Sequence, residues 1–302
     1  MIFAARGFLV SLAFFAMVYC PLSLLVVLAW WSWQRMGRKC TVSFANFLFG
    51  LRILPFTLSA LVAVFFTFPS FWLMERASLD EDAGTFILAA CSLLILSAGL
   101  FRVLRDQART TRAVNEWLSG ARSIGREAAA PALILVGIRR PRVIVSDMAT
   151  VVLSDREMQV AVRHELGHMR SWDNLKKVLI SCTPFPGMSS LEKAWREAAE
   201  LAADDAAVAN RRDALDLAAA LIKLSIYSKR WPEPALASGM IGHSSSISLR
   251  VQRLLEWRMV GRRLQRTWPW TLLVLFTAIA GIAGNYGATL VLTHRLTEFL
   301  VP

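Results

Sequence analysis

The stretch Val160-Ala161-Val162-Arg163-His164-Glu165-Leu166-Gly167-His168-Met169-Arg170 decides both the fold class and the candidate chemistry of this chain. It reads H-E-x-x-H inside a helical pattern. At 3.6 residues per turn, His164 and His168 lie on one face of the helix, where their imidazoles can bind one Zn²⁺. Glu165 lies one position further round and can accept a proton from a metal-bound water.

The motif alone leaves the metal site open, because two histidines four apart with a glutamate between them also occur in helices without metal. A second segment, residues 197–208, is Ala-rich and free of Gly and Pro, which predicts another helix. A site with two histidines needs a third protein ligand, and a carboxylate serves. Glu200 and Asp204 share one helical face, so Glu200 can ligate while Asp204 reaches a ligand histidine. The flanking alanines argue against the alternative, a solvated acidic face.

The composition indicates a membrane protein. The 302 residues are 55% hydrophobic with a mean hydropathy of +0.46, which is too apolar for an ordinary soluble enzyme. Apolar blocks at about 8–31, 53–72, 85–104 and 268–292 are each long enough to cross a bilayer, which takes about 20 residues. The net charge is +12, and the basic residues lie beside these blocks rather than in a patch interleaved with aromatic residues. No nucleic-acid partner is therefore expected. The four cysteines form no C-x-x-C pair, which predicts neither a disulfide framework nor a cysteine metal site.

The apolar blocks are interpreted as transmembrane helices. The first is too long for a cleaved signal peptide and lacks a small-x-small cleavage site near its end. In the second block, Pro55 is predicted in the first turn of the helix, where a missing N–H costs little. Glycines at 281, 284 and 287 could support close helix packing, although glycines are common in membrane helices in any case. Whether the protein forms a homo-oligomer is left open by the sequence.

The basic residues predict one orientation. The loop after the first block holds Arg35, Arg38 and Lys39, whereas the loop after the second holds one basic residue among four acids. Four arginines line the exit of the third block, and four precede the fourth. Because Lys and Arg near span ends resist translocation, the first loop and the region from about 106 to 266 are expected in the cytoplasm, with both termini outside. The predicted location is the cytoplasmic (inner) membrane, with the lipid bilayer as a partner.

Residues 106–266 have ordinary soluble composition and predict an α+β domain. Pro131–Gly137 and Pro141–Ser146 are short and β-branched, which is typical of two strands joined by a turn. Ser154-Asp-Arg-Glu157 matches a capping box that would start the helix of the H-E-x-x-H motif. The pattern further predicts a loop at 184–187, an amphipathic helix at 213–229, a mobile Gly/Ser loop at 239–246 and a basic helix at 248–263.

Two motifs carry a family resemblance. The run from His164 to Leu175, followed by Glu200-Leu-Ala-Ala-Asp204, resembles the membrane zinc peptidases of the BlaR/MecR type, which carry H-E-x-x-H, R-x-x-D-N-L and E-L-x-x-D. The resemblance is close over roughly 130–263, and the arrangement of spans extends it to nearly the whole chain. It implies a gluzincin with one zinc per chain. The ligands would be His164, His168 and Glu200, the catalytic base Glu165, and the group that orients a ligand Asp204.

The chain departs from that family in three places. It has Ala203 where the sensors often have Cys, and Leu166-Gly167 resembles the related HtpX and Ste24-like peptidases. The sensors continue beyond the fourth span into a large extracellular penicillin-binding domain, whereas about ten residues follow here. We therefore do not expect β-lactam sensing by this chain.

The sequence thus predicts a mainly α, multi-pass membrane protein with four transmembrane helices and a cytoplasmic α+β zincin-like metallopeptidase domain. Residues 1–105 would hold three spans, 106–266 the zinc domain, and 267–302 the fourth span with a short extracytoplasmic tail. The expected function is a zinc endopeptidase that cuts a cytoplasmic or membrane-proximal protein or peptide, in regulatory proteolysis. The alternatives are an HtpX-like quality-control peptidase and a non-catalytic transducer stabilised by zinc. An intact Glu165 favours an enzyme, since a structural zinc site needs no base beside its ligands.

The expected mechanism needs a group that stabilises the oxyanion of the transition state. His243 and Arg250 are the candidates. The alternatives are that Arg250 is a surface charge or a structural ion pair and that His243 is a plain loop residue.

Overall fold

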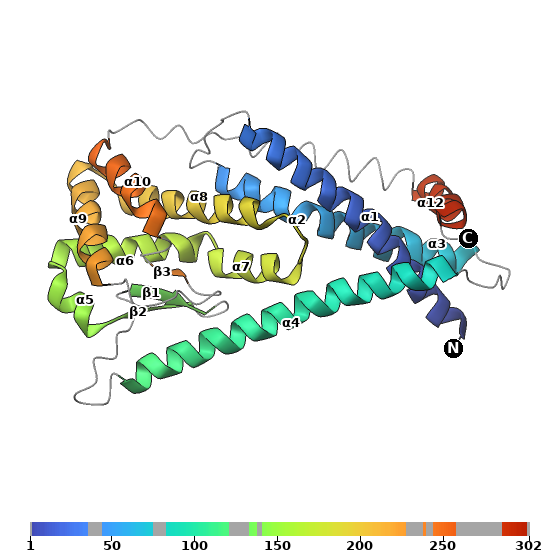
Figure 1. Ribbon diagram of the computed structural model, residues 1–302, viewed down its shortest axis with the longest axis horizontal. Helices are drawn as coiled ribbons and strands as arrows, with labels where there is room; N and C mark the ends of the chain where they lie inside the picture. Colours follow the sequence, from blue (N-terminus) through green and yellow to red (C-terminus); the bar gives the residue numbers. More distant parts are fainter. Residues whose placement is uncertain are drawn as a thin grey trace. The chain divides into compact units, whose positions relative to one another are not determined.

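The computed structural model describes residues 2–35, 44–74, 83–120, 133–137, 141–227, 238–239, 244–257 and 286–300, which are mainly helical (Figure 1). They divide into two compact units. Unit 1 comprises Met1–Ser32, Ile53–Ser97 and Val260–Pro302, and unit 2 comprises Trp33–Arg52 and Ala98–Met259. Both donor-bearing segments identified in the sequence belong to unit 2. The boundaries that the sequence suggests for the domains stay a prediction.

Three described helical stretches are long and apolar enough to cross a membrane: Ala4–Arg35, Ala45–Leu73 and Ala83–Glu116. They correspond to α1 (Ile2–Arg35), to α2 with its continuation, and to α4 (Ala83–Gly120). Large apolar side chains such as Phe8 and Leu94 are 62% and 70% exposed, as expected of helices whose backbone is satisfied internally and whose surface faces lipid. The first three predicted spans are therefore confirmed as helices of sufficient length.

Helix ends differ from the predicted block ends. Helix α2 (Ala45–Val62) begins before the second apolar block, so Pro55 lies inside the helix, and its predicted place in the first turn is wrong. The chain continues through a π-helical turn, η2 (Ala63–Thr67), into α3 (Phe68–Met74). Hydropathy locates the lipid-facing part of a helix and not its ends, because polar residues such as Arg52 can continue the same helix.

The fourth predicted span lies largely outside the described residues. Its last part, from Tyr286, belongs to α12 (Tyr286–Leu300), which continues beyond the predicted end of the span near 292. In unit 1, the Tyr286 hydroxyl donates a hydrogen bond to the Phe65 carbonyl at 3.0 Å. Phe65 lies in η2, so this bond joins α12 to the π-helical turn.

A small antiparallel sheet lies in unit 2. Strand β1 (Leu133–Val136) pairs with β2 (Arg142–Val145) on one side and with β3 (Ser238–Gly239) on the other, with Ile134 opposite Ile144 and Gly239. The two predicted strands are confirmed. The predicted loop at 239–246 is wrong at both ends, because Gly239 completes the sheet and Ser244 begins a helix; the middle of that loop lies outside the described residues.

Helix α6 (Asp155–Arg170) carries the H-E-x-x-H motif and begins with the predicted capping box. The Ser154 N–H donates to Glu157 Oε2 at 2.8 Å, and Ser154 Oγ accepts from the Glu157 N–H. Lys223 Nζ also donates to Glu157 Oε2 at 2.7 Å. The start of the helix that carries the H-E-x-x-H motif is therefore fixed by local sequence and by one tertiary ion pair.

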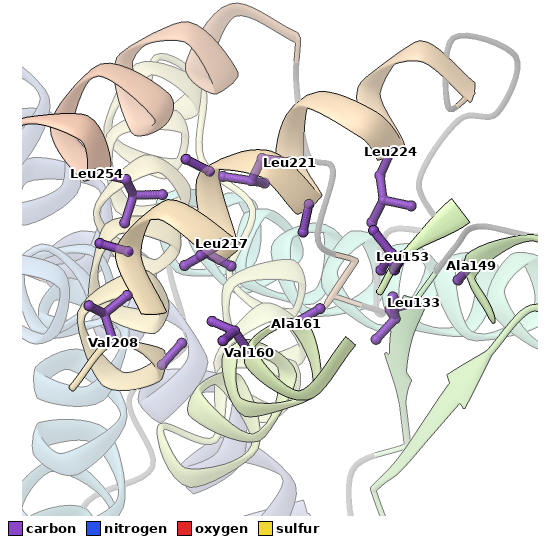
Figure 2. Packing of buried hydrophobic residues seen from close by; sticks show 14 residues of the cluster. Leu133, Ala149, Leu153, Val160, Ala161, Val208, Leu217, Leu221, Leu224 and Leu254 are labelled. Carbon is purple, nitrogen blue, oxygen red and sulfur yellow. The ribbon is translucent and has the colours of Figure 1, made fainter. Parts of the chain in front are cut away.

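The core of unit 2 positions this helix. Val160 and Ala161 of α6 pack against Leu217, Leu221 and neighbouring residues of the core (Figure 2). One face of α6 is thereby anchored, and the other presents its histidines. The remaining helices of unit 2 are α5 (Asp147–Val152), α7 (Asp173–Cys182), α8 (Ser189–Ala207), α9 (Arg211–Tyr227) and α10 (Ser244–Leu255).

Candidate metal centre

Helices α6 and α8 bring three potential metal donors together. His164 Nε2 and His168 Nε2 lie 3.2 Å apart. Glu200 of α8 places Oε2 3.5 Å from His164 Nε2 and Oε1 3.5 Å from His168 Nε2. The three side chains form a group that could hold a metal ion, which is the set that the sequence predicted.

The donor geometry fits zinc. With bonds of about 2.0–2.2 Å, a tetrahedral zinc ion has ligand atoms about 3.3–3.6 Å apart along each edge. The 3.2 Å between the two histidine nitrogens is close to such an edge, and so is the 3.5 Å from each nitrogen to a Glu200 oxygen, although His164 meets Oε2 and His168 meets Oε1. With one ligand atom from each residue, the three donors lie within 4.8 Å of one another. The two histidines are almost fully buried, whereas the Glu200 side chain keeps 15% of its surface exposed. Three protein donors leave one tetrahedral position for water or substrate.

A carboxylate stands behind each histidine. His168 Nδ1 lies 2.7 Å from Asp173 Oδ2, and His164 Nδ1 lies 3.0 Å from Asp204 Oδ1. A carboxylate at Nδ1 holds the proton there and turns the lone pair of Nε2 toward the metal position. Asp204 lies where the sequence predicted. The role of Asp173 was not predicted, although its place five residues after His168, in the R-x-x-D-N-L motif, was a usable signal.

A left-handed residue brings Asp173 to His168. Trp172 has φ 56° and ψ 34° and stands between α6 and α7, with its side chain 60% exposed. A non-glycine residue in this region costs about 1–2 kcal/mol. The reversal lets the first residue of α7 turn back onto the last turn of α6, where the Asp173–His168 contact offsets that cost.

Arg250 of α10 binds the two carboxylates of α8. Its Nε and Nη2 donate to Asp204 Oδ2 and Oδ1 at 2.8 and 2.7 Å, and Nη1 donates to Glu200 Oε2 at 2.8 Å. The arginine is 1% exposed. Of the alternatives that the sequence left open, the structure shows the ion pair, and this pair orients the metal donor Glu200. The other oxyanion candidate, His243, lies outside the described residues.

The electrostatics of the metal-free site favour a cation. Burial lowers the pKa of His168, but the charge of Glu200 and the bond to Asp173 outweigh it and raise the pKa to about 10. Burial also lowers the pKa of His164, and Asp204 and Glu200 raise it above its usual value. Burial raises the pKa of Asp204, yet Arg250 and His164 lower it to about 2. The Asp204 carboxylate is therefore ionised, and His168 holds a proton that a metal ion would replace.

Glu165 lies next to His164 on α6 and is fully buried. Its charge also acts on His168, after burial, Glu200 and Asp173, and helps to raise the pKa of that imidazole. The carboxylate is therefore close to the donor atoms without belonging to the donor set. This is the place that a general base needs.

Helices α6 and α8 approach closely at Gly167. A Cβ there would lie 3.2 Å from Ala203 Cα and 3.4 Å from the Ala203 carbonyl oxygen. These are two of the positions at which the sequence departs from the BlaR/MecR pattern, and they face each other at the helix crossing. The small residues allow Glu200 to approach the histidines.

Comparisons with curated proteins and with solved structures return no match. Residues 87–254 match the family described as BlaR1 peptidase M56. The match includes both donor-bearing helices, Asp173 and Arg250, and it spans more than half of the chain. A family model that covers both donor-bearing helices and more than half of the chain shows the family, and this protein belongs to the BlaR1 peptidase M56 family.

Proposed function

We propose that this protein is a membrane-embedded zinc endopeptidase that cleaves a cytoplasmic or membrane-proximal protein in regulatory proteolysis. The observation that carries the proposal is the donor set of His164, His168 and Glu200, whose ligand atoms lie within 4.8 Å of one another, with a buried glutamate beside it. Membership of a peptidase family and three apolar helices support the reaction class and the membrane location.

The residues of the site suggest how they would act. Zinc held by the three donors would supply a Lewis acid that polarises the scissile carbonyl and makes water acidic near neutral pH. Glu165 accepts a proton from the attacking water and delivers it to the leaving amide nitrogen. Asp173 and Asp204 hold the ligand imidazoles in one tautomer. Arg250 fixes Glu200, so the donors need not reorganise during turnover.

The oxyanion still needs a positive or polar group. His243 directly precedes α10, the helix that carries Arg250. Because Glu200 and Asp204 hold the Arg250 guanidinium, we retain His243 as the first candidate and Arg250 as the second. The site is proposed to face the cytoplasm, on the distribution of basic residues.

The test of this function is Glu165→Gln in the full-length protein, purified in detergent or nanodiscs. We expect unchanged zinc content and a loss of about 10²–10⁴-fold in hydrolysis of fluorescein-labelled casein, because a general base contributes about that much. Glu256→Gln, at an exposed residue directly after α10, is the matched control and should keep full activity. Cells that express Glu165→Gln should also accumulate the uncut substrate. The new N-termini of its cleavage products in wild-type cells would identify the substrate and the cut site.

Two outcomes would contradict the proposal. Casein hydrolysis by Glu165→Gln at the wild-type rate would remove the assigned base. A wild-type protein that holds one zinc per chain and cuts no protein in vitro or in cells would favour the non-catalytic transducer.

A further inference from the structure

Deepening the proposed function and resting on it, we propose that Lys176 and Arg52 are positioning residues that connect helix α2 to the metal ligand His168 through helix α7. The juxtaposition lies wholly within unit 2, which includes the first residues of α2 as well as α7 and α8. Helix α2 is also the start of a candidate membrane span, Ala45–Leu73. The metal site would therefore respond to the position of a membrane helix.

The first contact chain starts at the metal ligand. Asp173, the first residue of α7, holds His168 Nδ1 at 2.7 Å through Oδ2. Lys176 Nζ donates to the other oxygen, Oδ1, at 3.5 Å and to Asn46 Oδ1 of α2 at 2.9 Å. The same ammonium lies 5.7 Å from the ring centroid of Phe49, one turn further along α2. Lys176 thus links the group that orients His168 to the first two turns of α2.

The second contact chain holds the other end of α7. Arg52 of α2 is 1% exposed, and its Nη1 and Nη2 donate to Thr183 Oγ1 and the Thr183 carbonyl at 2.9 and 2.6 Å. Nη2 also lies 3.4 Å from the carbonyl of Ile180, in the last turn of α7. A buried cation at a helix C-terminus satisfies carbonyls that have no partner within the helix. Arg52 therefore caps α7 from α2.

Arg52 also reaches the helix of the third metal donor. Its Nε and Nη2 lie 3.0 and 2.9 Å from Oε1 of Glu192, in the first turn of α8. Helix α8 carries Glu200 two turns further on. One buried guanidinium therefore fixes the end of α7 and the start of α8 together.

Helix α4 completes the hold on α7. Ser181 Oγ donates to Asp106 Oδ2 at 3.1 Å, and Asp106 is buried. A Cβ on Gly99 of α4 would collide with the carbonyl oxygen of Cys182, which shows how closely the two backbones approach. The C-terminal end of α7 is therefore clamped, and its N-terminal end touches the metal ligand. A helix of ten residues is about 15 Å long and moves as a rigid body.

The consequence is mechanical. A 2.7 Å contact tolerates little displacement, so a shift or rotation of α7 changes the Asp173–His168 bond. Movement of the first turns of α2 must displace Lys176 and Arg52, and through them α7. Carboxylates that orient metal ligands set metal affinity by about 10–100-fold. A signal that reaches α2 would accordingly change zinc affinity and turnover.

The experiment measures zinc affinity of the full-length protein by chelator competition, alongside its unfolding temperature. Lys176→Gln and Asn46→Ala should each weaken zinc binding about three- to tenfold, and the double variant should be no weaker than the worse single one, since both break the same link. Lys193→Gln on the exposed surface of α8 removes an equal charge and should bind zinc like the wild type. Asp173→Asn is the positive control and should lose about 10–100-fold.

Arg52 is tested in the same assay. Arg52→Lys keeps the charge but loses the planar guanidinium that binds Thr183 and Glu192 together. Its zinc affinity should therefore lie between that of the wild type and that of Asp173→Asn. Should Arg52 variants fail to fold, Asn46→Ala alone tests the link between α2 and α7. The Asn46–Lys176 hydrogen bond is exposed, so its loss should not prevent folding.

Three results would overturn the inference. Lower unfolding temperatures with zinc affinity within twofold of the wild type would make Lys176 and Asn46 merely structural. Additive losses in the double variant would mean that the two residues act separately. Weak zinc binding in Asp173→Asn together with wild-type binding in Lys176→Gln would refute the coupling while leaving the proposed function intact, whereas a wild-type protein without zinc would remove both.

Discussion

At the scale of single residues, each histidine of this site is paired with a carboxylate. Each Nε2 faces the metal position, and each Nδ1 faces a carboxylate, Asp173 or Asp204. Removing a partner from a buried charge is costly, because the remaining charge stays unpaired. The pairs therefore keep four ionisable groups within a few ångströms of one another, and they raise the pKa of both histidines in the metal-free site.

Zinc binding should weaken as the pH falls. The pKa of His168 in the metal-free protein is raised to about 10, and that of His164 is raised above 6.5. Zinc must displace these protons, so each one costs about a factor of ten in affinity per pH unit below its pKa. Chelator competition at pH 6, 7 and 8 should show affinity rising with pH, by about tenfold per unit as the His168 proton is released.

The same shift has the opposite effect on the metal-free fold. A raised pKa means that protonated His168 contributes stability below its unfolded pKa of about 6.5, and this contribution is lost as the pH rises toward about 10. For the zinc-binding prediction above, an affinity that stays constant from pH 6 to 8 would contradict a protonated His168 in the metal-free protein.

At the scale of elements, the distance between α6 and α8 decides whether Glu200 can join the two histidines. Gly167 lies against the backbone of Ala203, which cannot rotate away as a flexible side chain could. The capping box at Ser154 and the core contacts of Val160 and Ala161 fix α6 from the other side. Close packing at one crossing therefore sets the geometry of a site one turn away.

Gly167→Ala should push α8 away by a few tenths of an ångström and widen the gap between Glu200 and the histidines. We expect at least a tenfold loss of zinc affinity, because tetrahedral ligation needs edges of about 3.3–3.6 Å. Overpacking should also destabilise the domain by about 1–3 kcal/mol. Zinc titration and thermal unfolding measure the two effects separately. Ala206→Gly, which removes another contact of the crossing, is the companion variant, and a Gly167→Ala protein with wild-type affinity would show that the crossing can relax.

At the scale of the whole molecule, three apolar helices and a net charge of +12 describe a membrane protein with an asymmetric distribution of basic residues. Cysteines 20, 91 and 182 are free in the part of the chain that the structure describes, in accord with the expected lack of disulfides among them. The proposal that the metal site faces the cytoplasm follows from charge alone.

Single-cysteine labelling tests this orientation. In a background without the four native cysteines, Ser78→Cys lies in the acidic loop after the second span and should react with a membrane-impermeant thiol reagent on intact cells or spheroplasts. Ser123→Cys, in the segment between α4 and β1, should react only after lysis. The reverse pattern would place the metal site outside and exclude a cytoplasmic substrate.

The sequence by itself determined the features that depend on local periodicity and local hydrogen bonds. Helical spacing places His164 and His168 on one face, and the capping box starts α6. Block length predicts four spans, and the described residues include helices of sufficient length for the first three. These features need no knowledge of the rest of the fold, because residues four apart on a helix meet wherever the helix lies. Glu200 could also be predicted as a candidate ligand, because Glu200 and Asp204 are four residues apart on α8, as the two histidines are on α6.

Only the tertiary structure decided which distant groups complete the site. Asp173 reaches His168 through a left-handed residue that no propensity favours at tryptophan, and Arg250 arrives on another helix to bind Glu200 and Asp204. Arg52 stands in the sequence directly before the second apolar block, yet in the structure it lies inside α2 and is buried against α7 and α8. A charge finds its partner by packing, and the contacts that bury it come from segments far apart in the chain, which local sequence patterns do not encode.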